Sequence, residues 1–277
     1  MKIGMTTFGF RHLVLDRSLS PSLDQIVRRA RALGFDSLQV CENARPMELS
    51  ERDWEAVLQS ADEVGLEIQL GCKTVDLDIL RLWAERASCL PSRMLRLVLE
   101  QDSRLPVSRT EVDRFLAGAM PVLEAKQLRL AIENHYDVAS RVLADVVASY
   151  PKDQVGFCVD TANSLRNFES TEMVLDLLGD RAFCYHVKDY SVEDGGLGFR
   201  VAGAPLGEGK LDLDLVLERI LNCDPAPPIF VENWRTATGD WETDVHQDDS
   251  WLRHSLDILR ARLSTMERVS PAWGSSD

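Results

Sequence analysis

An apolar stretch typical of a β-strand alternates with a helical pattern eight times along this chain of 277 residues, and this alternation limits the possible folds most strongly. A helix between two strands returns the chain to the edge where the first strand began, so successive strands run parallel. Eight such units favour a (β/α)8 TIM barrel as a single domain over residues 1–264, followed by a C-terminal tail over residues 265–277. The expected strands are Lys2–Thr6, Ser37–Glu42, Glu67–Cys72, Met94–Leu99, Arg129–Glu133, Val155–Asp160, Ala182–Lys188 and Pro228–Glu232.

The expected helices lie between these strands and have apolar residues at spacings of three and four. Their ranges are Ser22–Leu33, Glu51–Val64, Leu77–Ser88, Thr110–Lys126, Ala139–Tyr150, Thr171–Leu178, Leu213–Leu221 and Ser250–Leu263. An open doubly wound sheet is the competing fold, because it also alternates strands and helices. The first strand runs into Thr6-Thr7-Phe8-Gly9-Phe10, which lacks the glycine-rich turn of dinucleotide-binding sheets. The closed barrel is therefore the fold we expect.

The chain is acidic, with a formal net charge of −14 from 31 basic and 45 acidic residues. Such a charge repels phosphate backbones and anionic bilayers, so we expect neither nucleic acid nor a membrane as a partner. The start, Met1–Thr6, does not resemble a signal peptide, and no run of about 20 apolar residues occurs, which favours a cytoplasmic protein. The six cysteines include no CxxC pair and lie mostly in apolar patterns, so we interpret them as buried hydrophobic residues.

Polar side chains end four consecutive strands of the expected barrel. The fifth to eighth strands end at Glu133, Asp160, His186 and Glu232. Active sites of such barrels lie at the carboxyl ends of the strands, so these four side chains should point to one place. Three carboxylates so close together repel one another unless a cation lies among them. We therefore expect a divalent metal bound by these four residues; the oxygen-rich ligands suit Mn²⁺, Mg²⁺ or Co²⁺, and Zn²⁺ stays open.

Five segments of the sequence resemble the xylose isomerase-like barrels, a family that includes ketose 3-epimerases, sugar-phosphate isomerases, inosose dehydratase-like lyases and endonuclease IV nucleases. They read IENHYD, CVDTAN, YHVKDY, PLGEGKLDL and VENW. The resemblance covers nearly the whole chain. It implies that Glu133 and Glu232 bind the metal and also exchange protons with a substrate carbon, while Asp160 and His186 complete the metal shell. The nuclease branch uses several further histidines, and this chain has only five in all.

The reaction that follows from this resemblance is isomerisation or epimerisation of a small keto sugar or keto sugar acid. A metal that chelates a carbonyl and its neighbouring hydroxyl stabilises an enediolate, and Glu133 and Glu232 suit proton transfer on its two faces. Ketose epimerases usually have a substrate-contacting histidine where this chain has Asn163. The alternative is therefore a lyase, which dehydrates or decarboxylates a 3-oxo sugar acid or a related keto polyol with the same ligands. A non-catalytic sugar-binding barrel is a third interpretation, and the presence of both glutamates argues against it.

Four basic residues follow the strand ends or lie in the long loop after the seventh strand. They are Lys73, Lys188, Arg200 and Arg235. Together they would form an anion pocket in an otherwise acidic protein, which suits an acidic carbohydrate as the small-molecule partner. The sequence leaves open whether the chain forms a homo-oligomer.

The remaining candidates for the site surround the same strand ends. We expect His135 either to contact the substrate or to donate a hydrogen bond to a ligand carboxylate. Asn163 takes the position of the substrate-contacting histidine, and Phe8, Phe10 and Trp234 are candidates for the pocket wall. Glu208 lies between two glycines and is expected to fix the loop around it.

Overall fold

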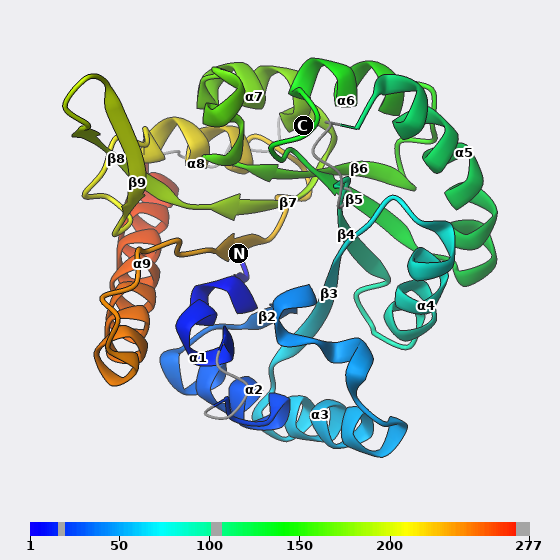
Figure 1. Cartoon of the computed structure of the whole chain (residues 1–277), viewed down its shortest axis with the longest axis horizontal. Helices are drawn as coiled ribbons and strands as arrows, with labels where there is room; N and C mark the ends of the chain where they lie inside the picture. Colours follow the sequence, from blue (N-terminus) through cyan, green and yellow to red (C-terminus); the bar gives the residue numbers. More distant parts are fainter. Residues whose placement is uncertain (16–19, 101–106, 270–277) are drawn as a thin grey trace, which may run out of the picture.

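The computed structural model describes residues 1–15, 20–100 and 107–269. Eight parallel strands form a closed barrel at its centre, in the hydrogen-bonded order β1, β10, β7, β6, β5, β4, β3, β2 (Figure 1). The strands are β1 Ile3–Thr6, β2 Ser37–Val40, β3 Glu67–Lys73, β4 Met94–Val98, β5 Arg129–Glu133, β6 Val155–Asp160, β7 Ala182–Val187 and β10 Ile229–Val231. The closed parallel barrel confirms the fold predicted from the alternation of strand and helix patterns.

Helices surround the barrel and cover the outer faces of its strands (Figure 1). They are α2 Leu23–Leu33, α3 Glu51–Val64, α4 Leu77–Ser88, α5 Arg109–Lys126, α6 Ser140–Val147, α7 Thr171–Leu178, α8 Leu213–Leu221 and α9 Trp241–Val269. The last helix starts well before Ser250 and continues past residue 264, so the expected start of the tail falls inside it; residues 270–277 lie outside the described part. Within the described ranges, no helix has both the length and the apolar character that crossing a bilayer requires.

The helices pack on the barrel because apolar side chains recur on one face of each. In α2, Ile26, Val27, Ala30 and Leu33 are buried, while the residues between them meet solvent. The helix ends where Gly34 adopts a left-handed conformation with φ of 103°, which glycine accepts without the steric cost of a side chain. The other helices that cover the barrel also bury one apolar face, which is why the spacing of apolar residues in the sequence predicted their positions.

Several elements follow strand ends where the sequence pattern predicted only loops. A 3-10 turn, η1 Thr7–Phe10, and a short helix, α1 Arg11–Leu15, follow β1. An antiparallel hairpin of β8 Asp189–Asp194 and β9 Phe199–Ala204 projects beside the barrel mouth (Figure 1). Further 3-10 turns are η2 Glu42–Ala44, η3 Pro46–Glu48, η4 Asn163–Asn167 and η5 Gly179–Arg181. The first turn and η4 lie at the open end of the barrel, where they place Phe8 and Asn163.

The sequence suggested that Glu208 fixes the loop after the hairpin. In the structure, Asp189 fixes this loop instead. The buried Asp189 carboxylate accepts backbone hydrogen bonds from Gly207, Gly209 and Leu211, at 2.9, 3.0 and 2.9 Å. A Cβ atom on Gly209 would lie 2.1 Å from Asp189 Oδ1, so the loop can approach this closely only at a glycine. Glu208 instead faces outward, with its carboxylate 3.3 Å from His254 Nε2.

We expect the Asp189→Asn variant to lose about 1–3 kcal/mol of unfolding free energy, because an amide group offers hydrogens where backbone donors need an acceptor. Chemical denaturation measures this change. Glu208→Gln is the matched control on the same loop, and it should stay within about 0.5 kcal/mol of the parent because its side chain is exposed. Equal stability of the two variants would contradict the anchoring role of Asp189.

Candidate active site

The polar residues of the candidate site form one layer inside the barrel, directly above an apolar layer. The apolar layer consists of Met94, Ala131, Cys158, Cys184 and Phe230. Two residues further along the same strands, or just past the end of β10, stand Arg96, Glu133, Asp160, His186 and Glu232. Side chains alternate between the two faces of a strand, so residues two apart point to the same side. The polar layer therefore faces into the barrel at its C-terminal end.

The imidazole of His186 faces the three carboxylates, and the sequence predicted that these four side chains point to one place. Its Nδ1 atom is 3.3 Å from Glu133 Oε2, 3.3 Å from Glu232 Oε2 and 3.9 Å from Asp160 Oδ2. The other ring nitrogen, Nε2, is 2.8 Å from the side-chain oxygen of Gln39 on β2. That contact orients the ring so that Nδ1 faces the carboxylates. The structure thus brings all four predicted metal ligands together.

The buried atoms of this cluster fit a divalent cation. Nδ1 of His186 is buried without a hydrogen-bond partner, although it faces oxygen atoms of three carboxylates. Two sets of side chains place their ligand atoms close enough to share an ion: Asp160 with His186 and Glu232, and Glu133 with Cys158 and His186. One imidazole with several carboxylates suits Mg²⁺, Mn²⁺ or Co²⁺, and the thiol in the second set also suits Zn²⁺. A divalent metal is therefore supported, and the choice of Mn²⁺ stays a prediction.

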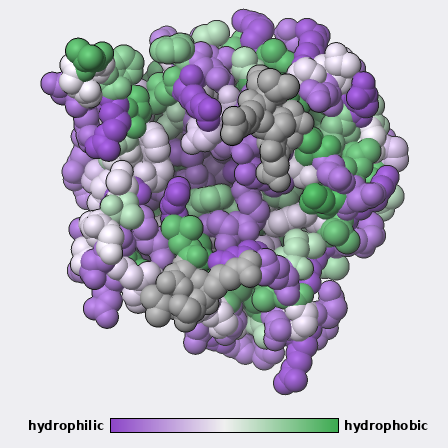
Figure 2. All heavy atoms as spheres, viewed as in Figure 1, coloured by the Kyte–Doolittle hydropathy of each residue, from purple (hydrophilic) through white to green (hydrophobic). Residues whose placement is uncertain are grey.

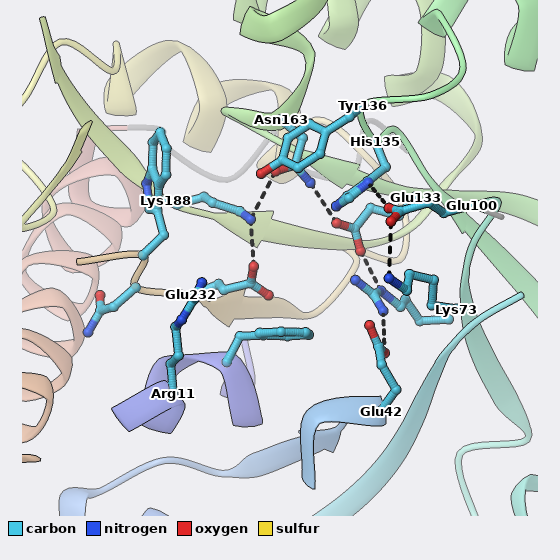
Figure 3. A pocket seen from close by; sticks show the side chains of 14 residues that line it. Arg11, Glu42, Lys73, Glu100, Glu133, His135, Tyr136, Asn163, Lys188 and Glu232 are labelled. Carbon is cyan, nitrogen blue, oxygen red and sulfur yellow. Dashed lines mark hydrogen bonds and ion pairs between the residues drawn. The ribbon is translucent and has the colours of Figure 1, made fainter. Parts of the chain in front are cut away.

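Two buried cations accompany the carboxylates. Lys188 Nζ lies 2.5 Å from Glu232 Oε1 and 3.2 Å from Asn163 Oδ1 (Figure 3). It also lies 2.9 Å from Asp160 Oδ2. On the opposite side, Arg96 Nε donates to Glu133 Oε2, and its Nη1 is 3.2 Å from Glu42 Oε2. Lys188 was expected at the rim, but it is buried inside the layer. Each glutamate therefore has a buried positive charge beside it.

These cations set the protonation of the two glutamates. Burial alone would raise the pKa of Glu133, but the Arg96 guanidinium and then His186 outweigh burial and lower that pKa. The pKa of Glu232 is lowered as well, because Lys188 and His186 outweigh its burial. Both side chains are therefore carboxylates at neutral pH, and both are weaker bases than a free glutamate.

The remaining pKa shifts have different dominant causes. For Asp160 burial prevails over the nearby ammonium of Lys188 and raises the pKa. Burial would lower the pKa of His186, but Cys158, Glu133 and Glu232 together raise it to about 9. For Lys188, burial is outweighed by Asp160 and Glu232, so the pKa is raised and the amine stays charged.

A pocket of about 260 Å³ opens above this layer at the barrel mouth. Its lining includes six of the predicted substrate-binding residues, Phe8, Lys73, His135, Asn163, Lys188 and Trp234. Figure 2 shows a hollow near the centre of this face, bordered mainly by hydrophilic residues. The volume and the polar lining suit a small hydrophilic ligand.

His135 and Lys73 meet on one side of the pocket. His135 Nδ1 lies 3.0 Å from one Glu100 oxygen, and Lys73 Nζ lies 3.0 Å from the other (Figure 3). Burial lowers the pKa of His135 to about 4, with only partial compensation by Glu133, so its ring is neutral at pH 7. Asn163 donates from its amide nitrogen to Glu133 Oε1 at 2.8 Å, which orients that carboxylate from the substrate side.

Three side chains that the sequence predicted at the pocket lie elsewhere in the structure. Arg200 lies on the exposed hairpin strand β9 and pairs with Glu193. Arg235 turns away from the mouth and is buried against Asp244 and Asp248, with contacts of 2.8 and 3.4 Å. Phe10 is fully buried in the core below the mouth. The loop path decides these directions, and a loop has no fixed side-chain period from which a sequence pattern could predict them.

Sequence reasoning also missed functional residues. Arg96 interrupts the apolar strand MLRLV, and a charged residue within a buried strand is a signal that could have identified it. Gln39 on β2 contacts His186, and Thr6 Oγ1 on β1, the strand paired with β10, donates to Glu232 Oε2 at 2.9 Å. Only barrel closure brings these strands beside Glu232 and His186, so no local pattern reveals them.

We expect His186→Ala to lose its divalent metal while it stays folded, because the residue lies at the barrel mouth. Elemental analysis after dialysis against Mn²⁺ should find about one ion per chain in the parent protein and well below that in the variant. His246→Ala, an exposed position on α9, is the control and should bind metal like the parent. Full occupancy in His186→Ala would refute the ligand assignment.

Comparison with known proteins gives the family. The model of the xylose isomerase-like TIM barrel matches residues 27–262. A 3-oxo-isoapionate decarboxylase from Pectobacterium atrosepticum is 27% identical over 273 residues, which cover 98% of this chain and 99% of the relative. D-psicose 3-epimerase from Clostridium cellulolyticum has a TM-score of 0.69 at 13% identity, covering 95% of this chain and 99% of its own. The IOLI protein, solved with a zinc atom, has a TM-score of 0.71 at 15% identity, covering 96% and 99%. The chain belongs to the xylose isomerase-like TIM barrel family.

Proposed function

We propose that this protein is a lyase that decarboxylates a small polyhydroxylated 3-oxo acid. The observation that carries the proposal is the pairing of each glutamate with a buried cation, Glu133 with Arg96 and Glu232 with Lys188. An isomerase or epimerase must remove a proton from carbon with a carboxylate base. A carboxylate that is ion-paired and has a lowered pKa is a poor base for that step. Decarboxylation of a 3-oxo acid needs no such base.

The chemistry of decarboxylation matches what the chain offers. The bond between the carboxylate carbon and C2 breaks, and its electron pair forms a double bond between C2 and C3 as the ketone oxygen becomes an enolate oxygen. Carbon dioxide leaves. A positive group beside the ketone oxygen stabilises the developing negative charge. The ammonium of Lys188, held by Asp160 and Glu232, is a positive group with several N–H donors at the pocket floor.

The reaction ends when C2 gains a proton. We assign this proton to Lys188, because an enolate carbon is a stronger base than an amine and the ammonium faces the pocket. Glu232, 2.5 Å away, then holds the amine in place while solvent restores its proton. Asn163 contacts both Lys188 and Glu133, and it orients them toward the same part of the pocket. Because Asn163 has an amide where ketose epimerases usually have an imidazole, it adds no second base that could remove a proton from the substrate.

A divalent metal held by Glu133, Asp160, His186 and Glu232 would act as a Lewis acid toward oxygen atoms of the substrate. The residues of the chain supply the rest: the buried cations counter the negative charge, Phe8 and Trp234 limit the access of water, and His135 offers a neutral ring to hydroxyl groups. A relative that matches nearly the full length is a 3-oxo-isoapionate decarboxylase, which supports a 3-oxo acid as the substrate class here.

A second candidate is the isomerase or epimerase that the sequence favoured. Glu133 and Glu232 both lie 3.3 Å from His186 Nδ1 and come from strands on opposite sides of it, an arrangement that suits proton transfer on two faces of a substrate. Structural neighbours of this chain include epimerases, such as the D-psicose 3-epimerase described above. The two candidates share one site and differ in what happens to the carbon skeleton.

One experiment separates the candidates. The protein, loaded with Mn²⁺, is incubated in heavy water with a panel of 3-oxo sugar acids and keto sugars, and the products are analysed by mass spectrometry. Decarboxylation predicts a product that has lost carbon dioxide and has gained a deuterium bound to C2, detected before this position exchanges further through the enol. Deuterium uptake without loss of carbon would instead establish the isomerase, and a barrel that only binds sugars would leave every compound unchanged.

A further inference from the structure

The cations that line the pocket at the barrel mouth differ in whether a carboxylate of the protein is paired with them. Lys188 is paired with Asp160 and Glu232, Arg96 with Glu133 and Glu42, and Lys73 with Glu100. All of these pairs except the one with Asp160 are drawn in Figure 3. The fourth lining cation is Arg11. In the part of the chain that the structure describes, the Arg11 side chain donates no hydrogen bond and forms no ion pair, and only its backbone N–H is bonded, to the Phe8 carbonyl. Its guanidinium therefore remains available to a ligand.

The backbone that carries Arg11 is held firmly on both sides. Phe10, just before it, is fully buried in the core. His12, just after it, is buried as well: its backbone N–H donates to Asp248 Oδ2 at 3.2 Å, and its ring Nδ1 lies 2.9 Å from the same oxygen. Asp248 belongs to α9 and is also contacted by Arg235, at 3.4 Å. The buried cluster formed by His12, Asp248 and Arg235 therefore fixes the start of α1 against the last helix.

This anchoring leaves the Arg11 side chain on the open side of α1. Figure 3 shows it extending from that helix toward the strand end that carries Glu232. It lines the pocket together with Glu232, Lys188 and Trp234. A charged group on a fixed backbone loses less conformational freedom when it binds than one on a mobile loop does. The pocket that Lys188 lines thus also has a second positive charge, carried on an anchored backbone.

We propose that Arg11 recognises the carboxylate of the substrate and thereby selects acids over neutral sugars. This inference rests on the proposed function in one respect, since it assigns a binding residue to the acidic substrate of that reaction. A guanidinium presents parallel N–H donors that match the two oxygens of a carboxylate, and the resulting ion pair is both directional and strong. Because the other lining cations are paired with carboxylates of the protein, Arg11 is the residue best able to discriminate.

The position of Arg11 also defines its kinetic signature. The contact forms with the charged acid when it binds, and the charge then moves toward the ketone oxygen as carbon dioxide leaves. An interaction made with the ground state affects KM more than kcat. Arg11 is therefore a specificity-determining residue, and its loss should weaken binding of acids more than it slows the bound substrate.

The test compares an acid with a neutral compound of the same skeleton. Titration calorimetry with Mn²⁺-loaded protein measures binding of threonate, a four-carbon polyhydroxy acid, and of threitol, in which an alcohol replaces the carboxylate. We expect the parent to prefer threonate, and Arg11→Gln to bind threonate about tenfold or more weakly with threitol binding unchanged. Arg11→Lys should recover part of the loss, because it restores charge without the parallel donors. Arg200→Gln, the same change on the exposed hairpin, should match the parent.

Two results would overturn the assignment: equal threonate affinity in Arg11→Gln and the parent, or a parent that binds threonate no better than threitol. Since the titration requires no turnover, it separates this inference from the proposed reaction. Arg11-dependent binding of threonate without decarboxylation of any 3-oxo acid would refute the lyase and leave the carboxylate site standing. If the parent decarboxylates a 3-oxo acid and Arg11→Gln does so with an unaltered KM, the lyase stands and the carboxylate site at Arg11 is refuted.

Discussion

Lys188→Met is expected to lower kcat for 3-oxo acid decarboxylation by about 10²–10³-fold, the loss seen when one donor to a developing oxyanion is removed. Methionine keeps the length and apolar stem of lysine, so the pocket floor stays filled while its charge is lost. The ammonium lies within 2.9 Å of both Asp160 and Glu232, and no other cation described in the structure contacts those two side chains at such distances. Steady-state kinetics with carbon dioxide detection measures the change.

The design includes two further variants. Lys188→Arg keeps the positive charge and should retain part of the activity, whereas a residue that served only for packing would tolerate methionine better than the larger arginine. Lys210→Met makes the same substitution at an exposed position after the hairpin and should leave kcat unchanged. A Lys188→Met enzyme that is folded, loaded with metal and active within threefold of the parent would remove Lys188 from the mechanism.

The two glutamates should respond unequally to substitution by glutamine. Glu232→Gln is expected to lower kcat by roughly 10²-fold or more, since it removes the carboxylate that holds the Lys188 ammonium. Glu133→Gln should cost about tenfold or less when metal is bound, because Glu133 is paired with Arg96 and transfers no proton in a decarboxylation. Glutamine keeps an oxygen near the metal site in both cases. Elemental analysis beside each kinetic measurement separates loss of metal from loss of chemistry.

The comparison between the glutamates discriminates between reaction classes. An epimerase needs one carboxylate on each face of the substrate, so both variants would lose turnover to a similar and large extent. Near-normal kcat in both variants, with metal bound, would instead exclude proton transfer by either residue. Gln59→Ala, an exposed change on α3, controls for preparation to preparation variation and should have no effect.

The features that the sequence predicted well depend on short-range periodicity. Strand and helix patterns located the eight barrel strands, and the rule that parallel strands end on one side placed Glu133, Asp160, His186 and Glu232 together. The hairpin of β8 and β9 was missed because its mostly solvent-accessible strands, DYSVED and FRVAGA, have few apolar residues facing a core. Its existence depends on pairing across a turn rather than on burial.

The charge distribution of the site depends on contacts between distant parts of the chain. Arg235 and Lys188 both follow strand ends in the sequence, yet one is buried against Asp244 and the other against Glu232. Nothing local distinguishes them, because the direction of each side chain is set by the path of the loop that carries it. For the same reason Arg11, which lies in a helix that the sequence pattern did not predict, was not a candidate.

The hairpin of β8 and β9 has a consequence for how this scaffold diverges. Asp189 closes its base, by pairing with Ala204 in the ladder and by accepting hydrogen bonds from Gly207 and Gly209, so the barrel contacts remain the same whatever lies beyond. Lengthening an excursion closed in this way costs little, about 0.6 kcal/mol for each doubling of its length. The rim of the pocket can therefore acquire or lose a whole ribbon through insertions and deletions, a kind of evolutionary change that leaves the catalytic layer untouched.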